Sequence, residues 1–258
     1  MPNPILDVQN VSKFYQPNAT PVLHNISFNI HAGEVVSLLG KSGCGKSTLL
    51  NCIGGFENIQ AGSILLDGQP VTKPSKRCMM LMQNYGLLPW RSVQKNIELG
   101  LEHSGLTKAE IRDKTSYYLQ LVGLEDRASA MPSELSGGMQ QRVAIARALA
   151  IQPEVILMDE PFGALDTFTR YYLQDELLQI QQRENTTIIL VTHDIDEAIY
   201  LSDRVFIMNA NQGQIHKEIN IALPKPRDRA DTDFQHYREL IFNEFQFNQP
   251  KAPIEFNI

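Results

Sequence analysis

The sequence predicts an α/β fold with a parallel-sheet core, an N-terminal antiparallel β subdomain and an inserted helical subdomain. Two apolar runs of the fully buried kind, at residues 155–158 and 187–191, flank a predicted helix near residues 169–183. A third such run, at residues 35–39, leads into a glycine-rich turn and another helix. Buried strands that alternate with helices are typical of a parallel sheet covered by helices. These three runs therefore predict the core of the fold.

Apolar and polar residues alternate with a period of two in the rest of the first third of the chain. The alternation occurs at residues 5–8, 26–30 and 63–68, and the last segment ends on Asp67-Gly68, a favoured hairpin turn. This pattern predicts antiparallel strands, because such strands bury one face and expose the other.

Apolar residues recur three and four positions apart between about residues 93 and 150, which indicates helices. Because this stretch separates two strands of the predicted core, we interpret it as an insertion. We expect one domain over residues 1–230, with the helical subdomain inserted at about 90–150. A helical tail at 231–258 is expected after the proline-containing break at residues 224–227.

The composition of the 258-residue chain is that of a globular protein, with 43% hydrophobic and 20% charged residues. A net charge of -6 without a block of Lys and Arg argues against a nucleic-acid partner. The apolar runs fall short of the roughly 18 residues that a membrane-spanning helix needs, and the start lacks a secretory signal. We expect a cytoplasmic protein with Cys44, Cys52 and Cys78 as reduced thiols.

Residues 40–47 read Gly-Lys-Ser-Gly-Cys-Gly-Lys-Ser, the spacing of a phosphate-binding loop. Its glycines let backbone N–H groups surround an anion at a helix N-terminus, and Lys46 and Ser47 are expected to hold the β- and γ-phosphates and Mg²⁺. The alternative, a glycine-rich turn without a ligand, is disfavoured by the position between a buried strand and a helix. We expect ATP to contact Gly40, Ser42, Gly43, Cys44, Gly45, Lys46, Ser47 and Thr48.

Two adjacent carboxylates, Asp159 and Glu160, follow the apolar run at residues 155–158. A Mg²⁺ ion that bridges phosphates needs an acidic partner beside the Ser47 hydroxyl, and Asp159 is placed to supply it. Glu160 is placed to orient or deprotonate the attacking water. The alternative is that the two carboxylates merely end a strand.

A third motif, Leu-Ser-Gly-Gly-Met-Gln-Gln-Arg at residues 135–142, leads directly into a helix. Ser136 as an N-cap, followed by Gly137 and Gly138, offers backbone donors to a second phosphate site. Here the chain resembles the ATP-binding cassette (ABC) ATPases, a class with a P-loop NTPase core whose signature is Leu-Ser-Gly-Gly-Gln. Met139 replaces the final Gln of that signature, but the three donors remain. The resemblance covers essentially the whole chain.

The resemblance implies roles for four further residues. Tyr15 would stack on adenine, although a half-buried strand aromatic is the alternative. Gln83 would sense Mg²⁺ and the γ-phosphate, as a catalytic residue and as a third metal contact beside Ser47 and Asp159. Asp166 would lie in the loop that crosses to another subunit. His193 would be the switch that contacts the γ-phosphate, and with Glu160 and Gln83 it completes the expected catalytic set.

The resemblance also implies partners. ABC ATPases work as homodimers in which the phosphate loop of one subunit and the signature of the other enclose each ATP. In ABC importers the loop after Gln83, here residues 84–93 with Trp90, receives an integral-membrane permease; packing onto the core is the alternative for this segment. We therefore expect a peripheral protein on the cytoplasmic face of the cell membrane, served indirectly by an extracytoplasmic solute-binding protein.

Residues 54–56, 159–166 and 226–229 look most similar to the nitrate/sulfonate/taurine importers, whose relatives also serve bicarbonate and vitamin precursors. The transported solute stays open at this point. The rival is a soluble ABC ATPase of DNA repair or translation. The repair type needs a long coiled coil between Gln83 and Ser136, for which about fifty residues are too few, and the translation type needs a second phosphate loop.

Overall fold

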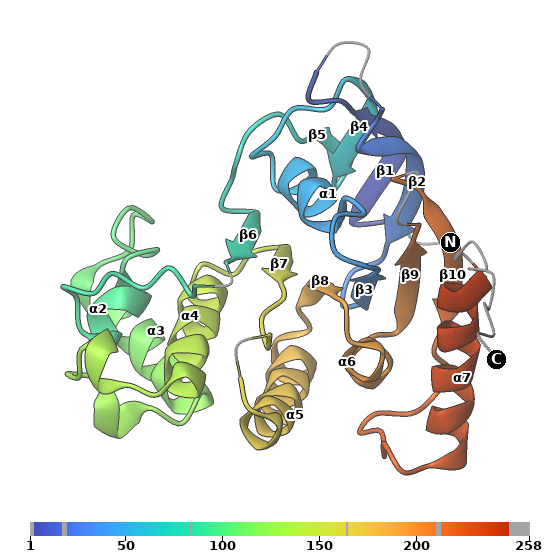
Figure 1. The fold of residues 1–258 in the computed structure, drawn as a ribbon. Helices are drawn as coiled ribbons and strands as arrows, with labels where there is room; N and C mark the ends of the chain where they lie inside the picture. Colours follow the sequence, from blue (N-terminus) through green and yellow to red (C-terminus); the bar gives the residue numbers. More distant parts are fainter. Residues whose placement is uncertain (1–2, 17–19, 83, 164, 210–212, 248–258) are drawn as a thin grey trace.

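The computed structural model describes residues 3–16, 20–82, 84–163, 165–209 and 213–247. It confirms the expected α/β fold. Figure 1 shows an antiparallel sheet above a second, mostly parallel sheet, with a group of helices to one side and the last helix at the opposite side. No helix in this described part of the chain is long and apolar enough to cross a membrane.

The smaller sheet contains the predicted antiparallel strands. Its order is β2 (Leu23–Ile30), β1 (Leu6–Lys13), β4 (Ala61–Leu66) and β5 (Gln69–Pro70). Alternate residues of β2 are buried from Ile26 to Ile30, as the period-two pattern predicts. Asp67 and Gly68 both have positive φ, at 46° and 69°, and they form the predicted hairpin turn between β4 and β5.

The core sheet has the order β10, β9, β3, β8, β7, β6 among the described residues. Five of these strands are parallel to one another, and only β10 runs antiparallel to its neighbour. The strand bounds are β3 (Val35–Leu39), β6 (Cys78–Leu81), β7 (Val155–Asp159), β8 (Thr187–Thr192), β9 (Arg204–Met208) and β10 (Ile215–Asn220). The pattern analysis predicted β3, β7 and β8 but did not identify β6, β9 and β10.

Both faces of the core sheet are covered, which explains the uninterrupted apolar runs in its strands. Val36 and Leu38 of β3 pack with α1 (Lys46–Ile53) and the antiparallel sheet, in one buried cluster. Val35 and Leu39 belong to a second cluster on the opposite face, formed with α5 (Thr167–Glu184) and α6 (Ile195–Leu201). Strand β3, whose carboxyl end leads into the phosphate loop, therefore lies between two well-packed layers.

The expected helical subdomain consists of α2 (Val93–Glu98), α3 (Lys108–Leu121) and α4 (Gly137–Ala150), with two short 3₁₀ turns. The start of α3 is defined by a capping box between Thr107 and Glu110. Tyr118 and Val143, two of the periodic residues, are fully buried where these helices meet. Helix α4 then carries the chain back into the core sheet at β7.

The tail forms α7 (Thr232–Phe247), which packs against α6. Phe234 and Ile241 of α7 are fully buried in the same cluster as the core sheet. Arg238 of α7 also forms an ion pair with Asp196 of α6. The tail helix thus adds to the core, and the division of the chain at residue 230 stays a prediction.

Candidate functional site

The phosphate-loop motif connects the carboxyl end of β3 to the first turn of α1. Gly43 and Gly45 have φ angles of 82° and 100°, a region that favours glycine. A Cβ atom on Gly45 would lie 2.8 Å from the carbonyl oxygen of Val22, and one on Gly40 would lie 2.7 Å from the Cys44 sulfur. Glycines at these positions therefore permit both the turn and its close packing.

Lys46 is buried, and its ammonium group is held by the loop itself. The Nζ atom donates hydrogen bonds to the carbonyl oxygens of Gly40 at 2.7 Å and Lys41 at 3.0 Å. The Lys46 ammonium group is thus positioned within the turn. A helix N-terminus such as the start of α1 favours anions, because its backbone N–H groups are free to donate. Cys44 is also buried, and burial raises the pKa of its thiol. The Cys44 side chain therefore packs inside the loop.

Ser47 and Asp159 meet although 112 positions separate them in the sequence. The Ser47 hydroxyl donates a hydrogen bond of 3.1 Å to Oδ1 of Asp159 at the end of β7. Burial raises the pKa of Asp159, and the neighbouring Glu160 adds to this, while the Ser47 hydrogen bond and Lys46 oppose it. A hydroxyl and a carboxylate beside a phosphate loop are the hard oxygen donors that Mg²⁺ prefers, so the donor set fits this ion.

Glu160 and His193 lie side by side where β7 and β8 end. The Nδ1 atom of His193 is 3.2 Å from Oε1 of Glu160. Glu160 has a φ angle of 46°, a strained conformation for this residue type, and its N–H is anchored on the carbonyl oxygen of Val191 at 3.0 Å. Such strain persists where the surrounding structure imposes it, often at active sites. The two predicted catalytic residues are therefore brought together.

Tyr15 lies just after β1, beside the first turn of α1. Its ring is 59% exposed, and its hydroxyl donates to Oε1 of Glu57 at 3.0 Å and lies 3.2 Å from the Thr48 hydroxyl. The ring is thus largely exposed, with Nζ of Lys13 5.2 Å from its centroid, and it is not a half-buried strand aromatic. The pattern analysis missed Glu57, which also pairs with Lys13 at 3.2 Å, because no motif marks it.

Ser136 is the N-cap of α4, where its hydroxyl accepts the Met139 N–H at 3.3 Å. A Cβ atom on Gly138 would lie 3.0 Å from Cγ2 of Thr169, so glycine allows α4 to approach α5. Asp166 is the N-cap of α5, and its carboxylate accepts the Thr169 N–H at 3.1 Å. Ser136, Gly137 and Asp166 are all exposed. The signature and the Asp166 loop therefore form one exposed group.

This exposed group is distant from the phosphate loop of the same chain. Within the described residues, no hydrogen bond joins residues 136–138 to residues 40–48. Figure 1 shows α4 in the helical group, well separated from α1. The two motifs that are predicted to bind phosphate thus lie apart within one chain.

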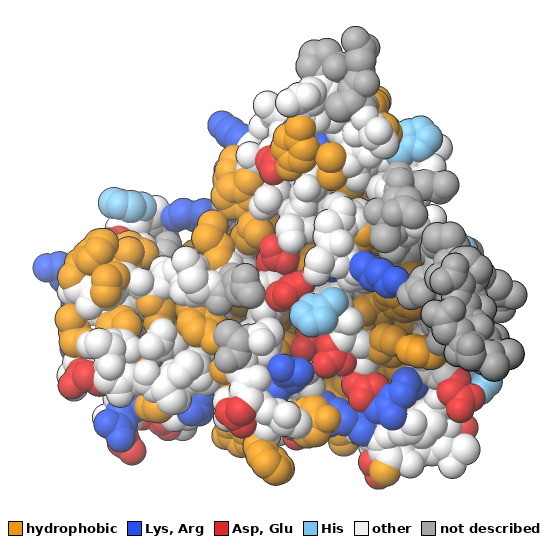
Figure 2. Space-filling view, in the orientation of Figure 1, with side chains coloured by type: hydrophobic (Ala, Val, Ile, Leu, Met, Phe, Trp, Pro, Cys, Tyr) orange, Lys and Arg blue, Asp and Glu red, His pale blue; other side chains and the backbone are white. Residues whose placement is uncertain are grey.

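Gln83 and Ala164 lie outside the described residues, so the structure does not place the predicted loop glutamine. The segment that follows it is described. Arg147 of α4 donates hydrogen bonds to the carbonyl oxygens of Tyr85 at 2.9 Å and Gly86 at 2.7 Å. Trp90 is 71% exposed, so it does not pack onto the core. Figure 2 shows apolar side chains gathered over the helical part of this face.

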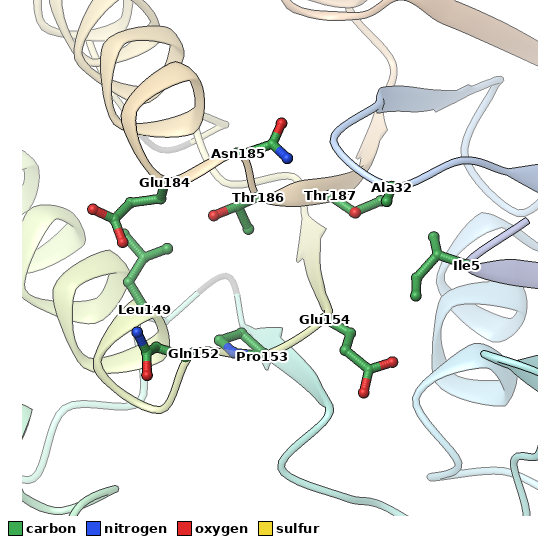
Figure 3. Close-up of a pocket in the computed structure, with 10 residues that line it drawn as sticks. All are labelled: Ile5, Ala32, Leu149, Gln152, Pro153, Glu154, Glu184, Asn185, Thr186 and Thr187. Carbon is green, nitrogen blue, oxygen red and sulfur yellow. The ribbon is translucent and has the colours of Figure 1, made fainter. Parts of the chain in front are cut away.

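A pocket of about 250 Å³ lies at the amino ends of the core strands, opposite the phosphate loop (Figure 3). Glu154 and Thr187 line it, and they stand where β7 and β8 begin. Ligands of parallel sheets bind outside the carboxyl ends of the strands. The phosphate loop, Glu160 and His193 follow these carboxyl ends here. The pocket is therefore separate from the site described above.

Comparison with known proteins agrees with the fold and the site. The family model for ABC transporters matches residues 23–163. The aliphatic sulfonates import ATP-binding protein SsuB of a Bacillus cereus strain is 46% identical, covering 94% of this chain and 96% of that protein. The SsuB protein of Bacillus subtilis (strain 168) is 47% identical over 87% of both chains.

Solved structures show the same architecture. CbiO1 of Clostridium perfringens, part of the ABC transporter complex cbiONQ, matches with a TM-score of 0.80 and 29% identity over 94% of both chains. The ATP-binding cassette MJ0796, solved as a dimer in a post-hydrolysis state bound to ADP and Pi, matches with a TM-score of 0.72 and 31% identity. That match covers 85% of this chain and 100% of MJ0796.

The fold and the paired motifs define a P-loop ATPase of the cassette type. The chain belongs to the ABC transporter family, as an ATP-binding subunit that hydrolyses ATP with Mg²⁺. ATP-binding cassettes of this family form dimers. The rival interpretation, a soluble ABC ATPase of the DNA-repair or translation type, finds no support among the relatives named above.

Proposed function

We propose that this protein is the ATPase of an importer for a small anion of the aliphatic sulfonate type, working through separate permease subunits. The observation that carries the proposal is the near full-length similarity to proteins named for aliphatic sulfonates import, at 46% and 47% identity. Nitrate, taurine, bicarbonate and vitamin precursors are the other solutes that the sequence resemblance suggests. The transported solute does not contact this subunit, so its identity comes from the partners.

Each residue of the site has a chemical role in this proposal. Lys46 and the loop N–H groups bind the β- and γ-phosphates, and Ser47 and Asp159 hold Mg²⁺, which supplies charge neutralisation on the phosphates. Glu160 orients the attacking water and accepts its proton. Nδ1 of His193 lies against Glu160, which leaves the other ring nitrogen, Nε2, to contact a γ-phosphate oxygen. Gln83 is the proposed third contact to Mg²⁺.

The proposed working unit is a two-fold dimer with two ATP sites. The separation of residues 136–138 from the phosphate loop within one chain supports this arrangement, because a single copy brings only one of the two motifs to a nucleotide. The exposure of Ser136, Gly137 and Asp166 leaves them free to meet a second copy. Tyr15 is proposed to stack on the adenine of its own subunit.

The proposed permease contact is the segment at residues 84–93. Arg147 fixes the backbone of Tyr85 and Gly86, while Trp90 stays exposed. An exposed indole in a segment whose backbone is fixed by hydrogen bonds is suited to contact an apolar partner helix. We infer that the protein acts on the cytoplasmic face of the membrane and that a solute-binding protein delivers the solute from the other side.

Transport by a reconstituted complex tests the proposal. The chain is co-expressed with the permease encoded beside it, placed in proteoliposomes, and supplied with ATP and the neighbouring solute-binding protein. Uptake of a radiolabelled aliphatic sulfonate, with nitrate and taurine as competitors, is the expected result. ATP hydrolysis without uptake of any of the three solutes would leave the ATPase intact and refute the proposed solute class.

A further inference from the structure

The segment between β10 and α7 carries Arg227 and Arg229, which contact the core in different ways. Arg227 is buried, and its guanidinium donates to backbone carbonyl oxygens at the end of α6, including Tyr200 at 3.3 Å and Ser202 at 2.6 Å. Arg227 therefore satisfies the last carbonyl groups of that helix. This contact anchors the segment.

Arg229 lies between two aromatic rings. Its Cζ atom is 3.5 Å from the ring centroid of Tyr200 on α6 and 4.1 Å from that of Tyr171 on α5. Cation–π contacts of this kind hold a guanidinium in one plane. In that plane, Nη2 of Arg229 donates a hydrogen bond of 2.6 Å to Oε1 of Gln174. The guanidinium of Arg229 is thus the hydrogen-bond donor to the carbonyl oxygen of the Gln174 amide.

The other end of the Gln174 amide faces a buried acid. Gln174 is 1% exposed and Glu197 is 4% exposed, and Nε2 of Gln174 donates to Oε2 of Glu197 at 3.2 Å. An amide has one donor end and one acceptor end. Because Arg229 can only donate, it orients the Gln174 amide so that the NH₂ group points to Glu197. Removal of Arg229 leaves a buried acceptor unpaired and frees the amide to rotate.

Glu197 in turn lies against the two neighbours of His193. The hydroxyl of Thr192, which is near enough to the Glu197 carboxylate to lower its pKa, accepts the Asp194 N–H at 3.0 Å. The Glu197 N–H donates to Oδ1 of Asp194 at 3.1 Å. Thr192 and Asp194 are the two neighbours of His193, so the network of Arg229, Gln174 and Glu197 ends on the residue that faces Glu160.

We propose that Arg229 is a positioning residue for ATP hydrolysis, which holds the His193 segment in place through Gln174 and Glu197. The inference rests on the proposed role of His193. Small displacements of a catalytic group are costly because the reacting geometry must be met closely, so a residue remote from the nucleotide can affect turnover. Arg229 belongs to the tail segment, and the tail thereby contributes to the active site without touching the nucleotide.

A second contact between tail and core provides the matched control. Arg238 of α7 donates from Nε to Oδ1 of Asp196 at 2.6 Å, and Asp196 is the immediate neighbour of Glu197 on α6. Within the described residues, Arg238 makes no hydrogen bond with Gln174 or Glu197, and it lies half-buried. Through Gln235, Arg238 reaches the backbone carbonyl of Arg229 but not its guanidinium, so loss of Arg238 weakens docking of the tail and removes no hydrogen bond of Gln174 or Glu197.

The experiment measures steady-state ATP hydrolysis by the full chain for the wild type and for Arg229→Ala, Arg229→Lys and Arg238→Ala. Arg229→Ala is expected to lower kcat on the order of tenfold, with the KM for ATP changed by less than about twofold. Arg229→Lys should recover part of the loss, because its ammonium can still lie against the rings and donate to Gln174. Arg238→Ala should retain the wild-type kcat.

A double-variant comparison separates positioning from general damage. In a His193→Ala background, measured by release of radiolabelled phosphate, Arg229→Ala should cause no further loss. An equal loss in both backgrounds, a raised KM without a change in kcat, or the same loss for Arg238→Ala would overturn the proposal. If Arg229→Ala does not fold, Gln174→Met provides the same comparison, because it keeps the side-chain volume and removes both hydrogen bonds. A wild type without ATPase activity would instead refute the proposed function itself.

Discussion

The Nδ1 atom of His193 lies 3.2 Å from a carboxylate oxygen of Glu160, although 33 positions separate the two residues in the sequence. The carboxyl ends of β7 and β8 create this pair, since the two strands are direct neighbours with Asp159 opposite Val191. His193, the proposed switch, is thus in contact with Glu160, the proposed catalytic carboxylate. This contact is why Glu160 is the first residue to test for a role in ATP hydrolysis.

Glu160→Gln is expected to bind ATP while losing turnover by about a hundredfold or more, because an amide cannot accept the proton of the attacking water. The variant should accumulate as an ATP-bound dimer. Nucleotide binding, phosphate release and size-exclusion chromatography with ATP measure these three properties. A normal rate of hydrolysis would remove Glu160 from the catalytic role.

Tyr15 allows a test that separates its ring from its hydroxyl. Tyr15→Phe loses the hydrogen bonds to Glu57 and Thr48 but keeps the ring, so the Kd for ATP should change little. Tyr15→Ala loses the stacking surface, and its Kd for ATP should rise by about tenfold, as expected for base–aromatic stacking. Titration with a fluorescent ATP analogue gives both values. Equal affinities for the two variants would exclude stacking on adenine.

Trp90→Ala is expected to weaken co-purification with the permease while the Kd for ATP stays unchanged, because Trp90 is exposed and apart from the phosphate loop. Phe242→Ala on α7 is the matched control, since Phe242 is also an exposed aromatic, at 50%. Tagged pull-down of the complex and nucleotide titration check the two properties. Undiminished assembly of the Trp90 variant would place the permease contact elsewhere.

Glu197 predicts a pH dependence of stability. Burial, which is the largest cause, raises its pKa from 4.5 to about 7, with Asp194 adding to the rise and Thr192, Arg170 and Gln174 opposing it. The folded state therefore binds the proton more tightly than the unfolded state. This contribution is fully present below pH 4.5 and is lost as the pH rises through about 7.

Glu197→Gln removes this titration, so the difference in unfolding free energy between variant and wild type should shift by about 2 to 3 kcal/mol in favour of the variant between pH 4.5 and 8. Urea denaturation at the two pH values measures it. Asp175→Asn, at another carboxylate near the tail, serves as a control for a general change of charge. Parallel pH profiles for wild type and Glu197→Gln would contradict the prediction.

Much of the site could be predicted from the sequence because its parts are local. A glycine with positive φ, a lysine and a serine at fixed spacing form the loop wherever a buried strand precedes them, as β3 does here. An N-cap serine before Gly137 likewise starts a helix by local hydrogen bonding. The roles of Tyr15, Asp166 and His193 came from the family resemblance, since a lone residue of these types has no local signature.

Some strands escaped prediction for physical reasons. β6 has only four residues and two methionines, which carry little strand preference, and β10 is an edge strand with mostly exposed side chains. Their place is decided by pairing with β7 and β9, a contact between distant parts of the chain. The exposure of Trp90 could not be predicted either, because the apolar segment around it suited burial and exposure equally. Only the packed fold shows that Trp90 is exposed.

The sequence by itself determined the phosphate loop, the two carboxylates after an apolar run, the signature helix and the α/β class, because each depends on residues within a few positions of one another. Only the tertiary structure decided which of these groups meet. The pairs Ser47 with Asp159 and Glu160 with His193, and the contact of Arg229 with Gln174, depend on strand order and helix packing. Such contacts close loops of many residues, and their partners are selected by the burial of the whole core.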